Sequence, residues 1–159
     1  MTGLAPRNVE ECGLSLSSAG LSVNMRIPAE RSYLNNALLT VREICDHLDI
    51  APVLTLRIVL ALEEALLNTF EHAYQEVGGV VDVQFAVTSN EFRVIVEDYG
   101  QGLLSCQTRE ISENLESLTA DRGRGLIILR GMADEAVVDS ANGQGTKATM
   151  LFRLLEERA

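Results

Sequence analysis

Glu64 and Asn68 stand one helical turn apart in a stretch rich in alanine, leucine and glutamate, so the spacing predicts that both side chains lie on one face of a helix. A carboxylate can take up a proton, and an amide oxygen can ligate a hard cation such as magnesium. The pair can therefore serve one ligand together. A polar stripe of this kind is also what an ordinary solvated helix face looks like, so the pair alone leaves both interpretations open.

An acid followed by glycines marks the end of an apolar, alternating stretch. Asp98 is followed by Gly100 and Gly102. Glycine adopts dihedrals that other residues avoid and lets a ligand lie against bare backbone, and the carboxylate can accept a hydrogen bond from an amino group on a flat heterocycle. The ordinary alternative is a strand that ends in a glycine turn, with the acid as part of the turn.

A third segment places Gly123 and Gly125 at the start of a predicted helix, with Arg122 and Arg124 beside them. Unpaired N–H groups at a helix start, together with the helix dipole, form an anion site, and the arginines add charge. A short Gly-X-Gly also occurs in plain loops, and the segment is neither a Walker A loop nor a Rossmann fingerprint.

Gly145 and Thr146 lead into the last predicted strand. The threonine hydroxyl can reach a phosphate or a water molecule beside a base, or it can simply close a hairpin turn.

The elements that must position these residues follow from hydrophobic periodicity. Strands are predicted at 21–27, 80–87, 91–97, 135–140 and 146–154, and helices at 30–48, from 52 to the glycines at 78–79, and at 125–132. This order predicts an α/β fold of the α+β two-layer sandwich kind, with a mixed, mostly antiparallel sheet and one helix layer. The second helix is apolar on most sides, so we expect it to pack between layers. The polar segment 98–121 is expected to be a lid with a short helix at 112–118, and residues 1–20 a flexible tail with a short strand at 13–17.

Composition excludes several classes of function. The chain has 159 residues, 47% of them hydrophobic, and a net charge of -10, which favours a single domain, 21–159, and argues against a general nucleic-acid binder. Cys12, Cys45 and Cys106 lack the spacing of a zinc or redox site. With no signal peptide and no apolar run long enough to cross a bilayer, we expect a cytoplasmic protein without membrane association.

Taken together and in this order, the four segments resemble the GHKL (Bergerat-fold) ATPases, and among them the anti-sigma-factor serine kinases of the RsbW and SpoIIAB type. The resemblance runs from about residue 21 to the C-terminus. Glu64 and Asn68 match the family's N box, and Asp98, Gly100 and Gly102 match its G1 box. The remaining matches are Gly123 and Gly125 for the G2 box and Gly145 with Thr146 for the Gly-Thr before the final strand.

The resemblance implies a Bergerat-type ATP-binding fold with an ATP lid, and ATP and Mg²⁺ as cofactors. Asn68 would ligate the magnesium ion, Glu64 would act as general base on a serine hydroxyl, and Asp98 would accept a hydrogen bond from the adenine amino group. The other residues implied in nucleotide binding are Gly100, Gly102, Arg122, Gly123, Arg124, Gly125, Leu126 and Thr146.

The implied function is that of a protein serine/threonine kinase and anti-sigma factor. It would phosphorylate a STAS-domain anti-anti-sigma partner, sequester a sigma factor and form a homodimer. We expect the partner surfaces on the first strand and the first helix, around Arg26, Arg31 and Arg42. Three alternatives remain open: a non-catalytic, nucleotide-dependent adaptor, an RsbT-like activator kinase, and the detached ATPase domain of a sensor kinase. Glu64 favours catalysis, because a pure binding module needs no base.

Overall fold

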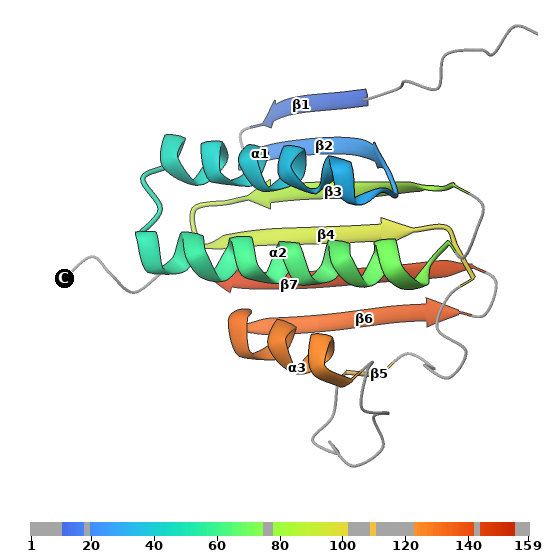
Figure 1. Ribbon diagram of the computed structural model, residues 1–159. Helices are drawn as coiled ribbons and strands as arrows, with labels where there is room; N and C mark the ends of the chain where they lie inside the picture. Colours follow the sequence, from blue (N-terminus) through green and yellow to red (C-terminus); the bar gives the residue numbers. More distant parts are fainter. Residues whose placement is uncertain are drawn as a thin grey trace, which may run out of the picture.

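The computed structural model describes residues 11–17, 20–74, 78–101, 109–110, 123–141 and 144–154. In these ranges the chain forms a seven-stranded sheet with helices against one of its faces (Figure 1). The strands are β1 (Glu11–Ser17), β2 (Gly20–Pro28), β3 (Val80–Val87), β4 (Glu91–Asp98), β5 (Arg109–Glu110), β6 (Glu135–Ala141) and β7 (Gly145–Arg153). The helices are the 3-10 turn η1 (Arg31–Tyr33), α1 (Leu34–His47), α2 (Pro52–His72) and α3 (Gly123–Met132).

The strand order across the sheet is β1-β2-β3-β4-β7-β6-β5, and all pairings among the described strands are antiparallel. The expectation of an α+β two-layer sandwich with a mostly antiparallel sheet is confirmed. β7 pairs with β4 and β6, so the last strand enters the centre of the sheet. This topology brings the end of β4 beside the start of β7, although many residues separate them along the chain.

Strict alternation makes one face of the sheet the core face. Every second residue of β3 and β4 is buried, and Phe85 meets Phe92 edge to face with ring centroids 6.4 Å apart. A one-residue slip of either strand would turn the phenylalanine of that strand to solvent, so burial fixes the register.

α2 starts at Pro52, whose missing N–H costs nothing at the first helical position. Its buried residues are Ile58, Val59, Ala61, Leu62, Ala65, Leu66 and Thr69. Its outward side exposes Val53 to 72% and Leu56 to 56%, so our expectation that α2 packs between layers is wrong. In a two-layer sandwich a helix buries one face only, and no described residue covers the other.

The short strand expected near residues 13–17 is confirmed, because β1 occupies Glu11–Ser17 within the segment expected to be a tail. The short helix expected at 112–118 lies outside the described residues.

Candidate functional site at the ends of two central strands

Glu64 and Asn68 lie on α2 outside its buried face, and both are half-buried. The amide nitrogen Nδ2 of Asn68 donates a hydrogen bond of 3.3 Å to Oε1 of Glu64. This bond fixes the orientation of the amide, and its oxygen Oδ1 receives no hydrogen bond from the described residues. The arrangement therefore presents one amide oxygen, suited to a hard cation, beside one carboxylate.

The G1 segment, residues 98–101, packs against the C-terminal end of this same helix. The carbonyl of Ala73, the residue after α2, accepts a hydrogen bond of 3.2 Å from the N–H of Gln101. A Cβ on Gly100 would lie 2.1 Å from that carbonyl oxygen, which is closer than any side chain can approach. Gly100 is thus required for packing between the two segments, whether or not a ligand also uses the open backbone.

Asp98 is the buried acid of the site, with 3% of its surface exposed at the end of β4. Its Oδ1 accepts hydrogen bonds from the N–H groups of Gly100 at 3.0 Å and Thr146 at 3.2 Å. Burial raises the pKa of Asp98 above its ordinary value, although these two N–H groups act in the opposite direction. Oδ2 receives no hydrogen bond within the described ranges, so it can accept one from a ligand.

A row of polar side chains crosses three neighbouring strands here. Thr146 pairs with Asp98 on one side and with Ser140 on the other. The Ser140 hydroxyl lies 3.2 Å from both the Gly145 carbonyl oxygen and the Thr146 hydroxyl. Sequence reasoning missed Ser140. The available signal was a serine at the position of β6 where the alternation calls for an apolar residue.

Tyr74 is a second residue that sequence reasoning missed. Its hydroxyl accepts a hydrogen bond of 2.9 Å from the N–H of Tyr99 and donates one of 2.8 Å to the carbonyl of Val80. The phenol thereby joins the end of β4 to the start of β3. A Cβ on Gly79 would lie 2.1 Å from the Tyr74 ring, so the glycine predicted to stop the second helix also makes room for this ring.

α3 runs antiparallel to α2 and packs beside it (Figure 1). Gly123, Arg124, Gly125 and Leu126 form its first turn, so their backbone N–H groups belong to a helix start, as expected. Their side chains, and all of Gly102 and Arg122, lie outside what the structure describes. The structure therefore brings Asp98, Gly100 and Thr146 together. Glu64 and Asn68 lie on the helix whose C-terminal end contacts Gly100, and Gly102 and Arg122 are unplaced.

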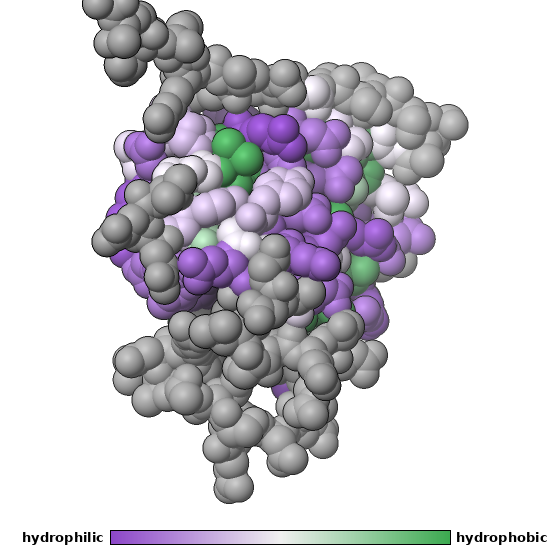
Figure 2. Space-filling view, turned by 90° about the vertical axis from the view of Figure 1, so that its right-hand side faces the viewer, coloured by the Kyte–Doolittle hydropathy of each residue, from purple (hydrophilic) through white to green (hydrophobic). Residues whose placement is uncertain are grey.

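The end of the molecule at which α2 and β4 terminate faces the viewer in Figure 2. Hydrophilic side chains dominate the coloured surface there, and hydrophobic patches are small. Arg31 forms an ion pair with Glu71 on the last turn of α2, and this places a cation close to the same end.

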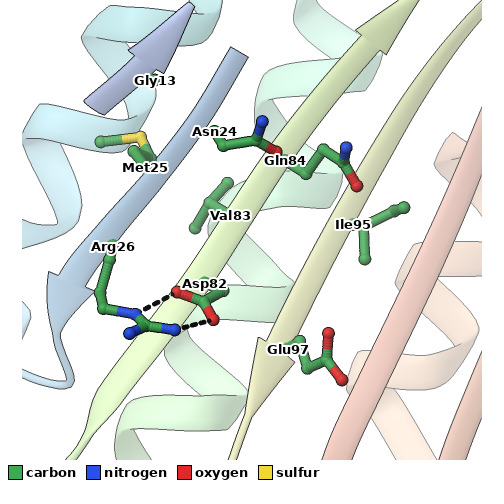
Figure 3. Close-up of a pocket in the computed structure, with 9 residues that line it drawn as sticks. All are labelled: Gly13, Asn24, Met25, Arg26, Asp82, Val83, Gln84, Ile95 and Glu97. Atoms are coloured by element: carbon green, nitrogen blue, oxygen red, sulfur yellow. Dashed lines mark hydrogen bonds and ion pairs between the residues drawn. The ribbon is translucent and has the colours of Figure 1, made fainter. Parts of the chain in front are cut away.

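A depression of about 510 Å³ lies elsewhere on the described surface. Asn24, Arg26, Asp82, Gln84, Ile95 and Glu97 line it on the sheet face away from the helices (Figure 3). Arg26 forms two hydrogen bonds with Asp82, of 2.6 and 2.7 Å, and the Tyr99 hydroxyl donates a third to Asp82 at 2.5 Å. None of the predicted nucleotide-site residues lines this depression. Arg26 and Arg31, two of the three arginines expected at partner surfaces, are already paired within the chain.

The fold and the site define a class of protein. Residues 27–152 match the model of the histidine kinase-like ATPase domain, and the chain belongs to this family. The expected family is therefore confirmed. No helix in the described part of the chain has the length and apolarity that a membrane crossing requires.

Comparison with individual proteins shows which members of this family the chain is similar to. The chain is 30% identical over 106 residues to the anti-sigma F factor of Clostridium acetobutylicum, covering 62% of this chain and 71% of the relative. It is 23% identical over 129 residues to the serine-protein kinase RsbW of Staphylococcus aureus, covering 76% and 80%. A solved structure of the RsbU and RsbW domains of a Mycobacterium tuberculosis protein superposes with a TM-score of 0.62 at 20% identity. That match covers 84% of this chain and 32% of the solved one, and it supports the fold.

Proposed function

We propose that this protein is an ATP-dependent serine-protein kinase and an anti-sigma factor, which phosphorylates a STAS-domain anti-anti-sigma partner and sequesters a sigma factor. The observation that carries the proposal is the pairing of Glu64 and Asn68. The hydrogen bond between them turns the amide nitrogen toward the carboxylate and leaves Oδ1 of Asn68 for a magnesium ion. The similarity to proteins named serine-protein kinase RsbW and anti-sigma F factor supports it.

The described residues fit a purine nucleotide. Asp98 has one oxygen held by two backbone N–H groups and a second that is available to accept from the adenine amino group. Thr146 lies beside it on β7. The N–H groups of the first turn of α3 would hold the phosphates, since a helix start favours anions.

Bound ATP with magnesium would supply the phosphoryl group and neutralise its charge. Asn68 would hold the metal through Oδ1, and Glu64 would take the proton from the hydroxyl of the substrate serine. The fixed spacing of the two residues on one helix would keep the base beside the metal ligand. A module that merely binds nucleotide has no use for Glu64.

The test is phosphoserine formation in a mixture of the protein, magnesium-ATP and a STAS-domain protein encoded near it. Glu64→Gln should lower the yield about 100-fold or more while ADP still binds, because only proton transfer is lost. Glu63→Gln is the matched control, since Glu63 is the neighbouring half-buried glutamate of α2, and it should leave the yield unchanged. Equal phosphoserine from Glu64→Gln and wild type would remove Glu64 as the base.

A different result separates the alternatives. ADP binding without any phosphoserine from the wild type would favour a non-catalytic adaptor.

The proposal also includes a homodimer that works in the cytoplasm, without contact to nucleic acid or membrane. Light scattering on the purified protein tests the dimer, and nucleotide-dependent co-purification of a sigma factor tests the partner; a monomer, or no retention in either nucleotide state, would contradict these parts.

A further inference from the structure

Arg57 joins α2 to the far end of α3. Its Nε donates a hydrogen bond of 2.8 Å to the carbonyl of Met132, the last residue of α3. Its Nη2 donates another, of 3.0 Å, to Oδ1 of Asp134. The Met132 carbonyl is one of those that a helix end leaves without an intrahelical partner, so Arg57 satisfies it from the neighbouring helix.

The other side of this contact is fixed to the sheet. Oδ2 of Asp134 accepts a hydrogen bond of 2.7 Å from the N–H of Arg153, and the N–H of Asp134 donates to the carbonyl of Leu151 at 2.9 Å. The guanidinium of Arg57 lies 6.0 Å from the centroid of the Phe152 ring. One arginine thus connects α2, the end of α3 and β7.

The position of this contact determines which residues of α2 lie beside the N-terminal end of α3. Glu64 comes seven residues after Arg57 on α2, and Gly125 comes seven residues before Met132 on α3. At the rise of an α-helix both intervals measure roughly 10 Å. The two helices run in opposite directions (Figure 1). Equal intervals from the contact at Arg57 therefore put Gly125 at about the same height along α2 as Glu64.

We infer that Arg57 is a positioning residue that sets the register of α3 along α2, and thereby holds the phosphate-binding N–H groups of α3 opposite Glu64 and Asn68. The inference rests on the proposed nucleotide site. Arg57 touches no part of that site itself and acts through α3. It bears on the phosphate end of the ligand, whereas the adenine end depends on Asp98 of β4.

Two affinities separate this role from simple stabilisation. In Arg57→Ala, affinity for magnesium-ADP should fall about tenfold, while affinity for adenosine, which has no phosphate, should stay at the wild-type value. Arg57→Lys keeps the charge but lacks the planar fork that reaches both acceptors, so it should show the same selective loss to a smaller degree. Arg42→Ala is the control: Arg42 is an exposed residue of α1 outside this contact, and neither affinity should change.

Unchanged ADP affinity in a folded Arg57→Ala, or an equal loss of ADP and adenosine affinity, would overturn the inference. If Arg57→Ala does not fold, the same comparison with Arg57→Lys decides. Hydrogen exchange without nucleotide gives an independent answer: the amides of α3 should exchange faster in the Arg57 variants and those of α1 at the wild-type rate. Unchanged hydrogen exchange of the α3 amides would also overturn the inference that Arg57 sets the register of α3. A wild type that binds no ADP would instead contradict the proposed function, and exchange would still report on Arg57.

Discussion

The N–H of Thr146 donates a hydrogen bond of 3.2 Å to Oδ1 of Asp98, and the two residues are direct partners across β4 and β7. With the N–H of Gly100 on the same oxygen, one side of the carboxylate is fully engaged by the protein. The other oxygen is left for a ligand. Because the protein engages one oxygen and leaves the other for a ligand, a substitution at Asp98 can separate the effect on ligand binding from the effect on folding.

Asp98→Asn should weaken nucleotide binding without unfolding the protein. The asparagine oxygen can still accept from Gly100 and Thr146, but its NH₂ group would face the adenine amino group, donor against donor. We expect ADP affinity to fall about tenfold or more. The free energy of unfolding should not fall, because an amide is less costly to bury than a carboxylate. Calorimetric titration and urea unfolding measure the two quantities.

The matched control is Asp139→Asn, at an exposed aspartate of β6. It removes the same charge from the chain and should change neither quantity. Retained ADP affinity in Asp98→Asn would remove Asp98 from the adenine site. A large loss of stability in the same variant would show that the charge itself supports the fold.

The pH dependence of ADP binding should also show whether the Asp98 carboxylate contacts the nucleotide. Burial raises its pKa above the ordinary value of 3.8, so the folded protein takes up this proton at a higher pH than the unfolded chain does. The cost of burying the carboxylate is therefore present above the raised pKa and disappears as the pH falls below the ordinary value. Affinity for ADP should begin to decline at a pH above 3.8, where the carboxylate becomes neutral.

ADP titrations at a series of pH values from neutral to mildly acidic measure this decline. The residual affinity of Asp98→Asn should be flat over the same window, and the difference in unfolding free energy between wild type and variant should shrink as the pH falls. Parallel pH profiles for the two proteins would assign the titration to another group.

Much of this arrangement could be predicted from sequence because it depends on local pattern. Alternation along β3 and β4 and helical periodicity along α2 are properties of consecutive residues, and so is the spacing of Glu64 and Asn68. The contacts of Tyr74, Arg57 and Ser140 could not be predicted in this way. The partners of Arg57 are distant in sequence, and the hydroxyls of Tyr74 and Ser140 meet their partners only after the strands have paired. The exposed outward side of α2 could not be predicted either. The apolar residues of α2 predict a helix, but they do not show how many layers pack against it.

Gly100→Ala should destabilise the fold, because the new methyl group would lie 2.1 Å from the Ala73 carbonyl oxygen. The chain must shift at the junction of α2 and the G1 segment, at a cost of about 1–3 kcal/mol in unfolding free energy. Gly131→Ala is the control: the helical Gly131 has no neighbouring atom within 4 Å of the added Cβ, and the change should stabilise by up to about 1 kcal/mol. Urea unfolding measures both. Equal stability of the two variants would contradict the close packing.

Tyr74→Phe removes one oxygen from the link between the start of β3 and the end of β4. The N–H of Tyr99 loses its acceptor and the carbonyl of Val80 loses its donor, and both bonds are solvent-exposed, so we expect a loss of about 0.5–1.5 kcal/mol in unfolding free energy. Because Tyr99 follows Asp98 directly, ADP affinity should fall as well. Tyr33→Phe is the control, since the Tyr33 hydroxyl makes no hydrogen bond to the described residues. A Tyr74→Phe variant with the stability and ADP affinity of Tyr33→Phe would show that the phenol does not hold Asp98 in place.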